Sequence, residues 1–303
     1  MELFRALAVL AEPPGEEVAR VAEALELGPM PGASEYTELF VFQLYPYASV
    51  YVSAEGMLGG EALDRISGFW RALSQTPPAE ADHLAVMLAL YARLCEIAAD
   101  ESDAVRRDVW ERARKAFLWE HLLSWLPVYL CKLTEMAAPF YRRWSEVLMK
   151  ALLAEARAVG QPEALPLHLR AATALIDPRQ GGDVKEFLQS LLSPVRSGMI
   201  LTRSDLGRAA RRLGLGMRLG ERAFILRGLF GQNASGMLEW LIEEASRWAS
   251  HHQSYADSLG EVGLAWKAKA LAAASLLQEL KQEATKVSLG EHHRSSLQRS
   301  SLS

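Results

Sequence analysis

Hydrophobic positions recur at intervals of three and four residues along most of this chain. This is the period of an amphipathic α-helix. Leu3, Leu7 and Leu10 open the first apolar stripe, and similar stripes follow one another to about residue 158. No alternating pattern of useful length indicates a β-strand. The sequence therefore predicts an all-α protein.

Prolines and glycines interrupt the helical pattern between residues 159 and 185, where only one short helix is expected. Helical stripes then resume, and the last residues are rich in serine and arginine. Four regions are predicted: a helical bundle at 1–158, a linker with a short helix at 159–185, a second helical region at 186–289, and a disordered tail at 290–303.

The segment from Tyr45 to Gly60 breaks the helical pattern of the first region. It holds three tyrosines, one proline and three glycines. Pro46 lacks a backbone donor and disfavours helical geometry at the residue before it. Loops that a rigid helical scaffold carries are frequent binding sites. We therefore expect this aromatic segment to take part in binding.

Composition indicates a globular protein, since half of the 303 residues are hydrophobic and 23% are charged. Cys95 and Cys131 lie in apolar helical runs outside any CxxC pair, which is typical of reduced core thiols in the cytoplasm. The first residues do not resemble a secretory signal. The longest uncharged run, 39–54, is interrupted by polar residues and a proline, so no membrane span is expected.

Charge is distributed unevenly along the chain. Residues 1–100 hold fifteen acidic side chains against five arginines, a net charge of −10, and the other 203 residues carry +6. The acidic first region argues against nucleic acid as its partner. It would steer a cationic peptide toward the protein, although a solvated acidic surface is an equally ordinary explanation.

Asp82 and His83 lie near the expected start of a long helix. Adjacent helical residues point about 100° apart, so these two side chains are poorly placed to form a catalytic dyad with each other. The pair is explained by binding at the edge of the aromatic segment or by a structural role. GxSxG, HExxH and phosphate-loop motifs are absent from the sequence. No catalytic residue, metal site or cofactor is predicted, so an enzyme is not expected.

Residues 196–227 carry eight arginines and only Asp205 and Glu221 as acids, and their start resembles a helix-turn-helix. The helix that would read DNA, 221–230, has bulky apolar residues that require burial, which leaves few side chains for base edges. An all-α scaffold or DNA-binding regulator that uses this basic segment remains the alternative interpretation. No nucleic-acid partner is expected.

Several motifs in order resemble the TorD/DmsD/NarJ family, which are maturation chaperones for molybdenum enzymes. The resemblance covers roughly residues 1–155 and rests on Tyr36–Phe40, Pro46–Tyr51, Gly56–Leu58, Phe69-Trp70, Asp82–Leu84 and Trp125–Pro127. The residues on both sides of Asp82-His83 are less acidic than is usual in the family. This difference concerns the identity of the client rather than the fold. Residues 192–201 are similar to the C-terminal extension of a longer subgroup.

The resemblance implies an all-helical TorD-like bundle followed by a second helical region, without catalytic activity. Such a protein would bind the apo form or the twin-arginine signal peptide of a molybdopterin-dependent oxidoreductase in the cytoplasm, and hold it until cofactor insertion before export. Its partner would be the catalytic subunit or that peptide, and a homodimer is possible. The residues expected to bind the client are Tyr47, Ser49, Tyr51, Trp70, Asp82, His83, Leu84 and Trp125.

Overall fold

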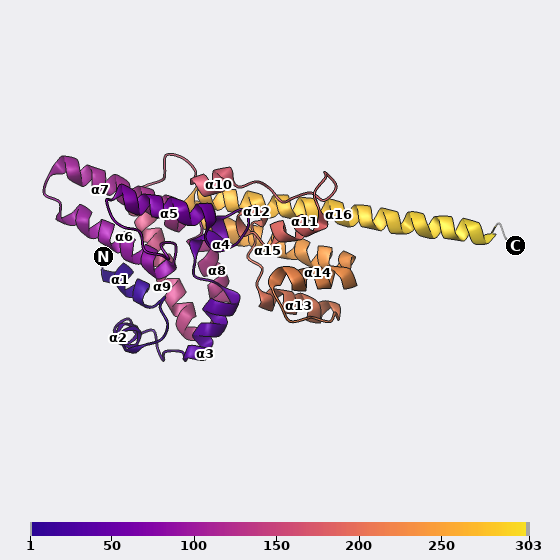
Figure 1. Cartoon of the computed structure of the whole chain (residues 1–303), viewed down its shortest axis with the longest axis horizontal. Helices are drawn as coiled ribbons and strands as arrows, with labels where there is room; N and C mark the ends of the chain where they lie inside the picture. The colour runs from indigo at the N-terminus through magenta and orange to yellow at the C-terminus, as the bar shows by residue number, and fades with distance from the viewer. Residues whose placement is uncertain (1, 301–303) are drawn as a thin grey trace.

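Helices make up the regular structure of the described chain, which confirms the all-α prediction (Figure 1). The computed structural model describes residues 2–300, with side chains through residue 284. The elements of the first region are α1 (Glu2–Val9), α2 (Glu16–Ala24), α3 (Ala33–Tyr36), η1 (Thr37–Gln43), α4 (Ala48–Val52), α5 (Gly60–Ala72), α6 (Leu84–Asp100), α7 (Ala104–Phe117), η2 (Leu118–Leu123), α8 (Leu126–Met136) and α9 (Pro139–Val159).

Helix α6 lies at the centre of this first region. It is apolar on almost every side, and most of its side chains are buried, as expected of a helix enclosed by others. Helices α1 and α7 pack against it, and α8 packs against α9. Asp103 ends the turn after α6 and caps α7 by accepting hydrogen bonds from the backbone N–H groups of Val105 and Arg106. The amphipathic stripes of the sequence thus enclose one core.

Two wide π-helical turns replace parts of the expected α-helices. The sequence predicts one α-helix over 35–44, whereas the chain changes from α3 into the π-helix η1. The N–H of Leu44 bonds the carbonyl of Leu39 at 2.8 Å, five residues earlier. This wide turn leaves Phe40 buried in the core and Phe42 exposed. Helical periodicity does not reveal such a local insertion.

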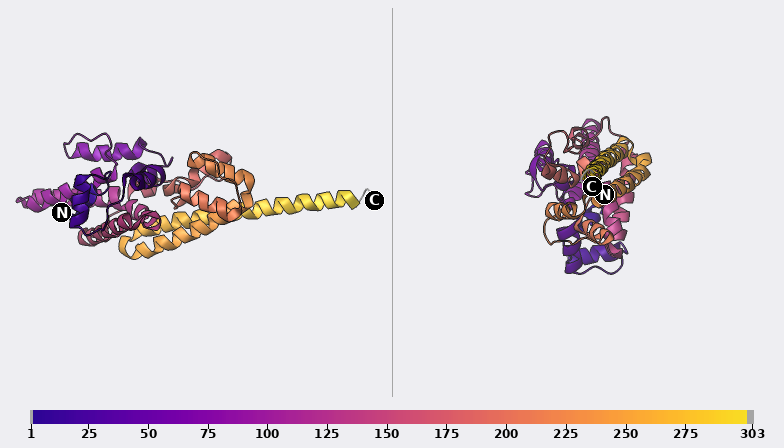
Figure 2. Two further views of the ribbon diagram at one scale, coloured as in Figure 1. Left: turned by 90° about the horizontal axis from the view of Figure 1, so that it is seen from below. Right: turned by 90° about the vertical axis from the view of Figure 1, so that its right-hand side faces the viewer.

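The rest of the chain forms α10 (Leu167–Ala171), α11 (Val184–Leu191), α12 (Pro194–Ser197), α13 (Arg203–Leu213), α14 (Arg222–Gln232), α15 (Ala234–Leu259) and α16 (Glu261–Ser300). Here the part from α11 to α16 is called the extension. Helices α15 and α16 pack along each other, and α16 continues beyond the body of the protein as a rod (Figures 1 and 2). The extension is helical throughout its described length apart from short turns.

The extension packs directly on the first region, and the buried apolar residues of both belong to one continuous cluster. The Trp266 indole N–H donates to the carbonyl of Ser124 at 2.9 Å. Gly198, at φ +70°, lets α12 approach α16 so closely that an added Cβ would lie 2.3 Å from the Ala270 nitrogen. The division into the domains 1–158 and 186–289 with a linker between them stays a prediction.

The end of the chain differs from the expected tail at 290–303. Helix α16 runs without interruption through Ser300, and residues 301–303 lie outside the described residues. Extending an existing helix costs far less than starting one, and Gly290 alone does not stop it. In the part of the chain that the structure describes, no helix is both long enough and apolar enough to span a membrane.

Candidate client-binding groove

The aromatic segment is tied to the start of α6 by a short antiparallel bridge between Tyr47 and His83. The Ala48 N–H donates to the carbonyl of Asp82 at 3.0 Å, and the Leu84 N–H donates to that of Pro46 at 2.8 Å. The segment is therefore not irregular throughout, because the short helix α4 forms inside it. This antiparallel contact between the segment and the start of α6 is called the junction.

Asp82 and His83 begin two different helices. The Asp82 carboxylate accepts the N–H of Ser49, in the first turn of α4, at 3.2 Å. His83 is the N-cap of α6, and its Nδ1 accepts the N–H of Ala85 at 3.3 Å. The long helix therefore begins at Leu84 rather than near residue 79. A pair of helix caps gives this Asp-His sequence a structural role.

Tyr47 and His83 also meet through their rings, whose centroids lie 4.9 Å apart in an edge-on arrangement. Burial and a hydrogen bond to the exposed Glu80 raise the pKa of Tyr47 to about 12. Burial lowers the pKa of His83, against the opposing effect of Glu12, Glu80 and Asp82. At neutral pH the junction thus holds a neutral imidazole and a protonated phenol beside an acidic rim.

The other predicted site residues differ in exposure. Tyr51 stacks on Trp125 with ring centroids 5.2 Å apart and planes at 11°, and its hydroxyl donates to the Tyr45 carbonyl at 2.8 Å. Six members of the predicted set are buried: Ser49, Tyr51, Asp82, His83, Leu84 and Trp125.

Tyr47 and Trp70 remain partly exposed. Trp70 lies on α5, and its buried indole N–H has no hydrogen-bond partner in the described chain. The structure thus brings Tyr47, Ser49, Asp82, His83 and Leu84 together at the junction, stacks Tyr51 on Trp125 in the core, and leaves Trp70 on a separate helix. In this conformation the buried members pack beneath the surface rather than at it.

A groove of about 810 Å³ separates the aromatic segment from the extension. Its apolar wall includes Phe42, Met57 and Leu58, whose exposed fractions are 45%, 62% and 58%. The opposite wall comes from α11 and from the starts of α13 and α14. Three large apolar side chains exposed together in one concavity are typical of a surface that binds another molecule.

Gly56 sets the approach of the two walls. At φ +64°, it lies where an added Cβ would be 3.0 Å from the Ser193 Cα, so a larger residue would be strained and crowded. The Ser193 hydroxyl donates to the carbonyl of Ser53 at 3.0 Å, and the Gln189 side chain donates to that of Glu55 at 3.2 Å. The extension thereby fixes the turn that displays Met57 and Leu58.

The groove is charged as well as apolar. Four acidic side chains line its rim and are exposed: Glu55, Asp183, Glu186 and Glu221. Three partly buried arginines line it more deeply: Arg196, Arg203 and Arg222. The acidic rim suits a cationic group at the mouth of the groove.

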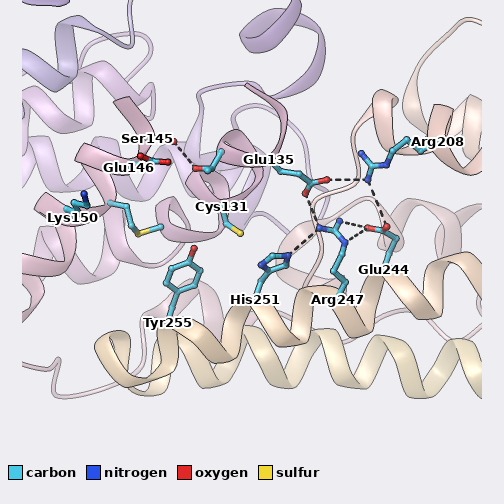
Figure 3. Close-up of a pocket in the computed structure, with 12 residues that line it drawn as sticks. Cys131, Glu135, Ser145, Glu146, Lys150, Arg208, Glu244, Arg247, His251 and Tyr255 are labelled. Atoms are coloured by element: carbon cyan, nitrogen blue, oxygen red, sulfur yellow. Dashed lines mark hydrogen bonds and ion pairs between the residues drawn. The ribbon is translucent and has the colours of Figure 1, made fainter. Parts of the chain in front are cut away.

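A second cavity, of about 800 Å³, lies between α8 and α9 on one side and α13 and α15 on the other (Figure 3). Four of its charged side chains form a network: Glu135, Arg208, Glu244 and Arg247. Arg247 contacts Glu135 at 3.0 Å and Glu244 at 2.5 Å, and Arg208 contacts Glu135 at 3.3 Å. Because these charges are satisfied internally, the network is better explained as a tie between the first region and the extension.

The region that forms the junction and the apolar wall is similar to known proteins. The family model described as "Nitrate reductase delta subunit" matches residues 9–130. Two proteins named "Chaperone protein TorD", from Vibrio vulnificus strains YJ016 and CMCP6, are each 32% identical over 108 residues. The match covers 32% of this chain and 49% of each relative, so the chain spans about half the length of the curated relatives it matches.

Residues 9–130 are thus similar to the TorD/DmsD/NarJ family.

These residues are called the TorD-like region below. They hold the junction and the apolar wall, whereas the opposite wall of the groove lies in the extension, outside the match. The predicted set of site residues leaves out Met57 and Leu58, which are exposed in the aromatic segment. Their flanking glycines, in Gly56-Met57-Leu58-Gly59, were the available signal, because apolar residues in a glycine-rich turn have no helix face on which to be buried.

Proposed function

We propose that this chain is a cytoplasmic maturation chaperone for a molybdopterin-dependent oxidoreductase, and that it catalyses no reaction. The apolar groove on the TorD-like region carries the proposal. The similarity of residues 9–130 to the TorD/DmsD/NarJ family supports it. The junction supports the absence of catalysis, since its phenol has a raised pKa and its imidazole serves as a helix cap.

The proposed client segment is the twin-arginine signal peptide, which combines an arginine pair with an apolar stretch. The apolar stretch would lie against Phe42, Met57 and Leu58, and burial of these side chains would supply most of the affinity. The arginine pair would meet acidic side chains at the rim, such as Glu55 and Glu186, which contribute to the rate of encounter. The chaperone would hold the apo form until the cofactor is inserted, before export.

DNA binding through 196–227 finds less support in the structure. Helix α14, which would read the bases, buries Ile225, Leu226 and Leu229 against the rest of the extension. Arg222 faces the groove rather than an open convex surface. The absence of a nucleic-acid partner stays a prediction.

Calorimetry of the full chain with a twin-arginine peptide tests the proposal. We expect saturable binding that weakens when both peptide arginines are replaced by glutamine and when salt is raised. The variant Met57→Ser/Leu58→Ser should bind about tenfold more weakly or worse, because two apolar contacts are lost. Val105→Ser is the matched control, since Val105 is an exposed apolar residue on α7, outside the groove.

A second titration separates the two possible sources of the client segment. It uses the apo oxidoreductase without its signal peptide. If this protein binds and the peptide does not, the client is recognised through its mature part. If neither binds, the proposed function is wrong.

A further inference from the structure

Three arginines converge on the deep side of the groove from separate parts of the extension. Arg196 lies on α12, Arg203 is the first residue of α13, and Arg222 is the first residue of α14. All three side chains are partly buried, whereas the acids of the same groove are exposed at its rim. Apart from the exposed Lys185, the positive charge of the groove thus lies on partly buried side chains, which water screens less.

These arginines lack the partners that other arginines of the extension have. Arg208, Arg212 and Arg247 each pair with glutamates. Among the described residues, no carboxylate lies within ion-pair distance of the three groove arginines: Arg196, Arg203 and Arg222.

Backbone contacts hold two of them in place. Arg196 donates its Nε–H to the carbonyl of Ala174 at 3.1 Å. Arg222 donates from one terminal nitrogen to the carbonyl of Leu201 at 2.9 Å. A guanidinium has five N–H donors, so each anchored group keeps donors for a ligand.

Burial makes these unpaired charges costly. It lowers the pKa of Arg196 and of Arg222, although Glu55 acts against this effect at Arg196. At Arg222, Tyr51, Tyr45 and Asp205 act against burial, whereas the positive charge of the nearby Arg203 lowers the pKa further. Arg203 and Arg222 therefore lie close enough to repel each other. An anion between them would relieve both their desolvation and their mutual repulsion.

We propose that Arg196, Arg203 and Arg222 bind the phosphate group of a small molecule. Guanidinium groups match phosphate oxygens in geometry and form strong, often bidentate, hydrogen bonds with them. The groove, at about 810 Å³, falls in the size range of small-molecule sites. Glu221 provides no side-chain hydrogen bond at the start of α14, so backbone N–H groups there add to the positive potential.

The exposed acids restrict the rest of the ligand. Glu55 and Glu186 line the rim and would repel a second negative group near the mouth. The site therefore favours a ligand whose phosphate groups lie at the three arginines and whose remaining body is neutral or cationic. This inference concerns the arginines of the extension, and it does not depend on whether a signal peptide binds against the apolar wall of the same groove.

Calorimetric titration of the full chain with inorganic pyrophosphate, without any peptide, tests the site. We expect saturable binding that Arg203→Gln and Arg222→Gln each weaken by about tenfold or more, because a charge-assisted hydrogen bond is lost. Arg222→Lys keeps the charge without the planar fork and should lie between wild type and Arg222→Gln. Arg227→Gln is the control, since Arg227 is exposed on the same helix outside the groove.

Three results would overturn the proposal. The first is that wild type binds no pyrophosphate. The second is that Arg227→Gln loses as much affinity as Arg222→Gln in variants that keep the wild-type circular dichroism spectrum, which would indicate a general charge effect. The third is that a glutamate-rich peptide binds the same arginines more tightly than pyrophosphate, which would assign the site to an acidic protein segment.

Discussion

A buried ion pair between α8 and α13 joins the first region to the extension. Lys132 Nζ lies 2.7 Å from an Asp205 carboxylate oxygen, and both side chains are 0% exposed. Arg208 contacts the same carboxylate at 2.6 Å. Burial by itself raises the pKa of Asp205, but Lys132 and hydrogen bonds from Thr202 outweigh burial and lower it below its ordinary value. The carboxylate is therefore ionised and central to this contact.

Replacing Asp205 with asparagine should be strongly destabilising. Lys132 would stay buried, with Glu135 at 3.2 Å as its remaining carboxylate among the described residues. Removing one partner of a buried pair typically costs about 3–5 kcal/mol of unfolding free energy. Replacing both charges, in Lys132→Met/Asp205→Asn, should recover most of this loss, because a buried pair and its uncharged replacement are often about equally stable.

Urea unfolding at pH 7, followed by circular dichroism, measures this effect in wild type, both single variants and the double variant. Arg212→Gln is the control, since it breaks an exposed ion pair from the same helix to Glu243 and should cost much less in solvent. The reasoning is refuted if Asp205→Asn costs less than about 1 kcal/mol. It is also refuted if the double variant loses the sum of the two single losses, which would mean that the charges are not coupled.

Three further predictions concern stability. Burial lowers the pKa of His121 to about 3, so below pH 6.5 the unfolded state binds a proton that the folded state does not. This residue therefore lowers the free energy of unfolding by about 1.4 kcal/mol for each pH unit of acidification. His121→Leu should make this pH dependence less steep in urea titrations between pH 6.5 and 4.5. Gly198→Ala should cost about 1–3 kcal/mol more than Gly214→Ala in urea unfolding, because both positions have positive φ but only Gly198 would press a Cβ against Ala270. Because the pKa of Asp205 is lowered in the folded state, its carboxylate stabilises the fold above the unfolded pKa, and this stability is lost as pH falls through the folded pKa. Below pH 4, the free energy of unfolding in urea should therefore depend less on pH in Asp205→Asn than in wild type.

The helices could be predicted from sequence because their signals are local. The apolar run of α6 and the Asp103 cap of α7 both lie within a few residues of the structure that they specify. Helix α4 could not be predicted in this way. It has five residues, and its capping carboxylate comes from Asp82, 33 residues away from Ser49. Only the tertiary fold brings this partner into place.

The candidate site was predictable in position but not in exposure. The motif residues identified the junction and the aromatic segment, yet Tyr51 and Trp125 stack inside the core. A tyrosine in the short helix α4 and a tryptophan in the turn before α8 give no local signal that they will meet. The arginine cluster was equally hidden, since Arg196 and Arg222 are 26 positions apart in the sequence and become neighbours across the groove through the packing of α11, α12 and α14.

Site-specific crosslinking tests the central claim most directly. A photoreactive amino acid is placed at Leu58 in the groove or at Val105 on α7, and each variant is irradiated with a labelled twin-arginine peptide. The account predicts a crosslink from position 58 that unlabelled peptide suppresses, and none from position 105. Equal crosslinking at both positions, or none at position 58 while the peptide still binds, would contradict a client-binding groove at this place.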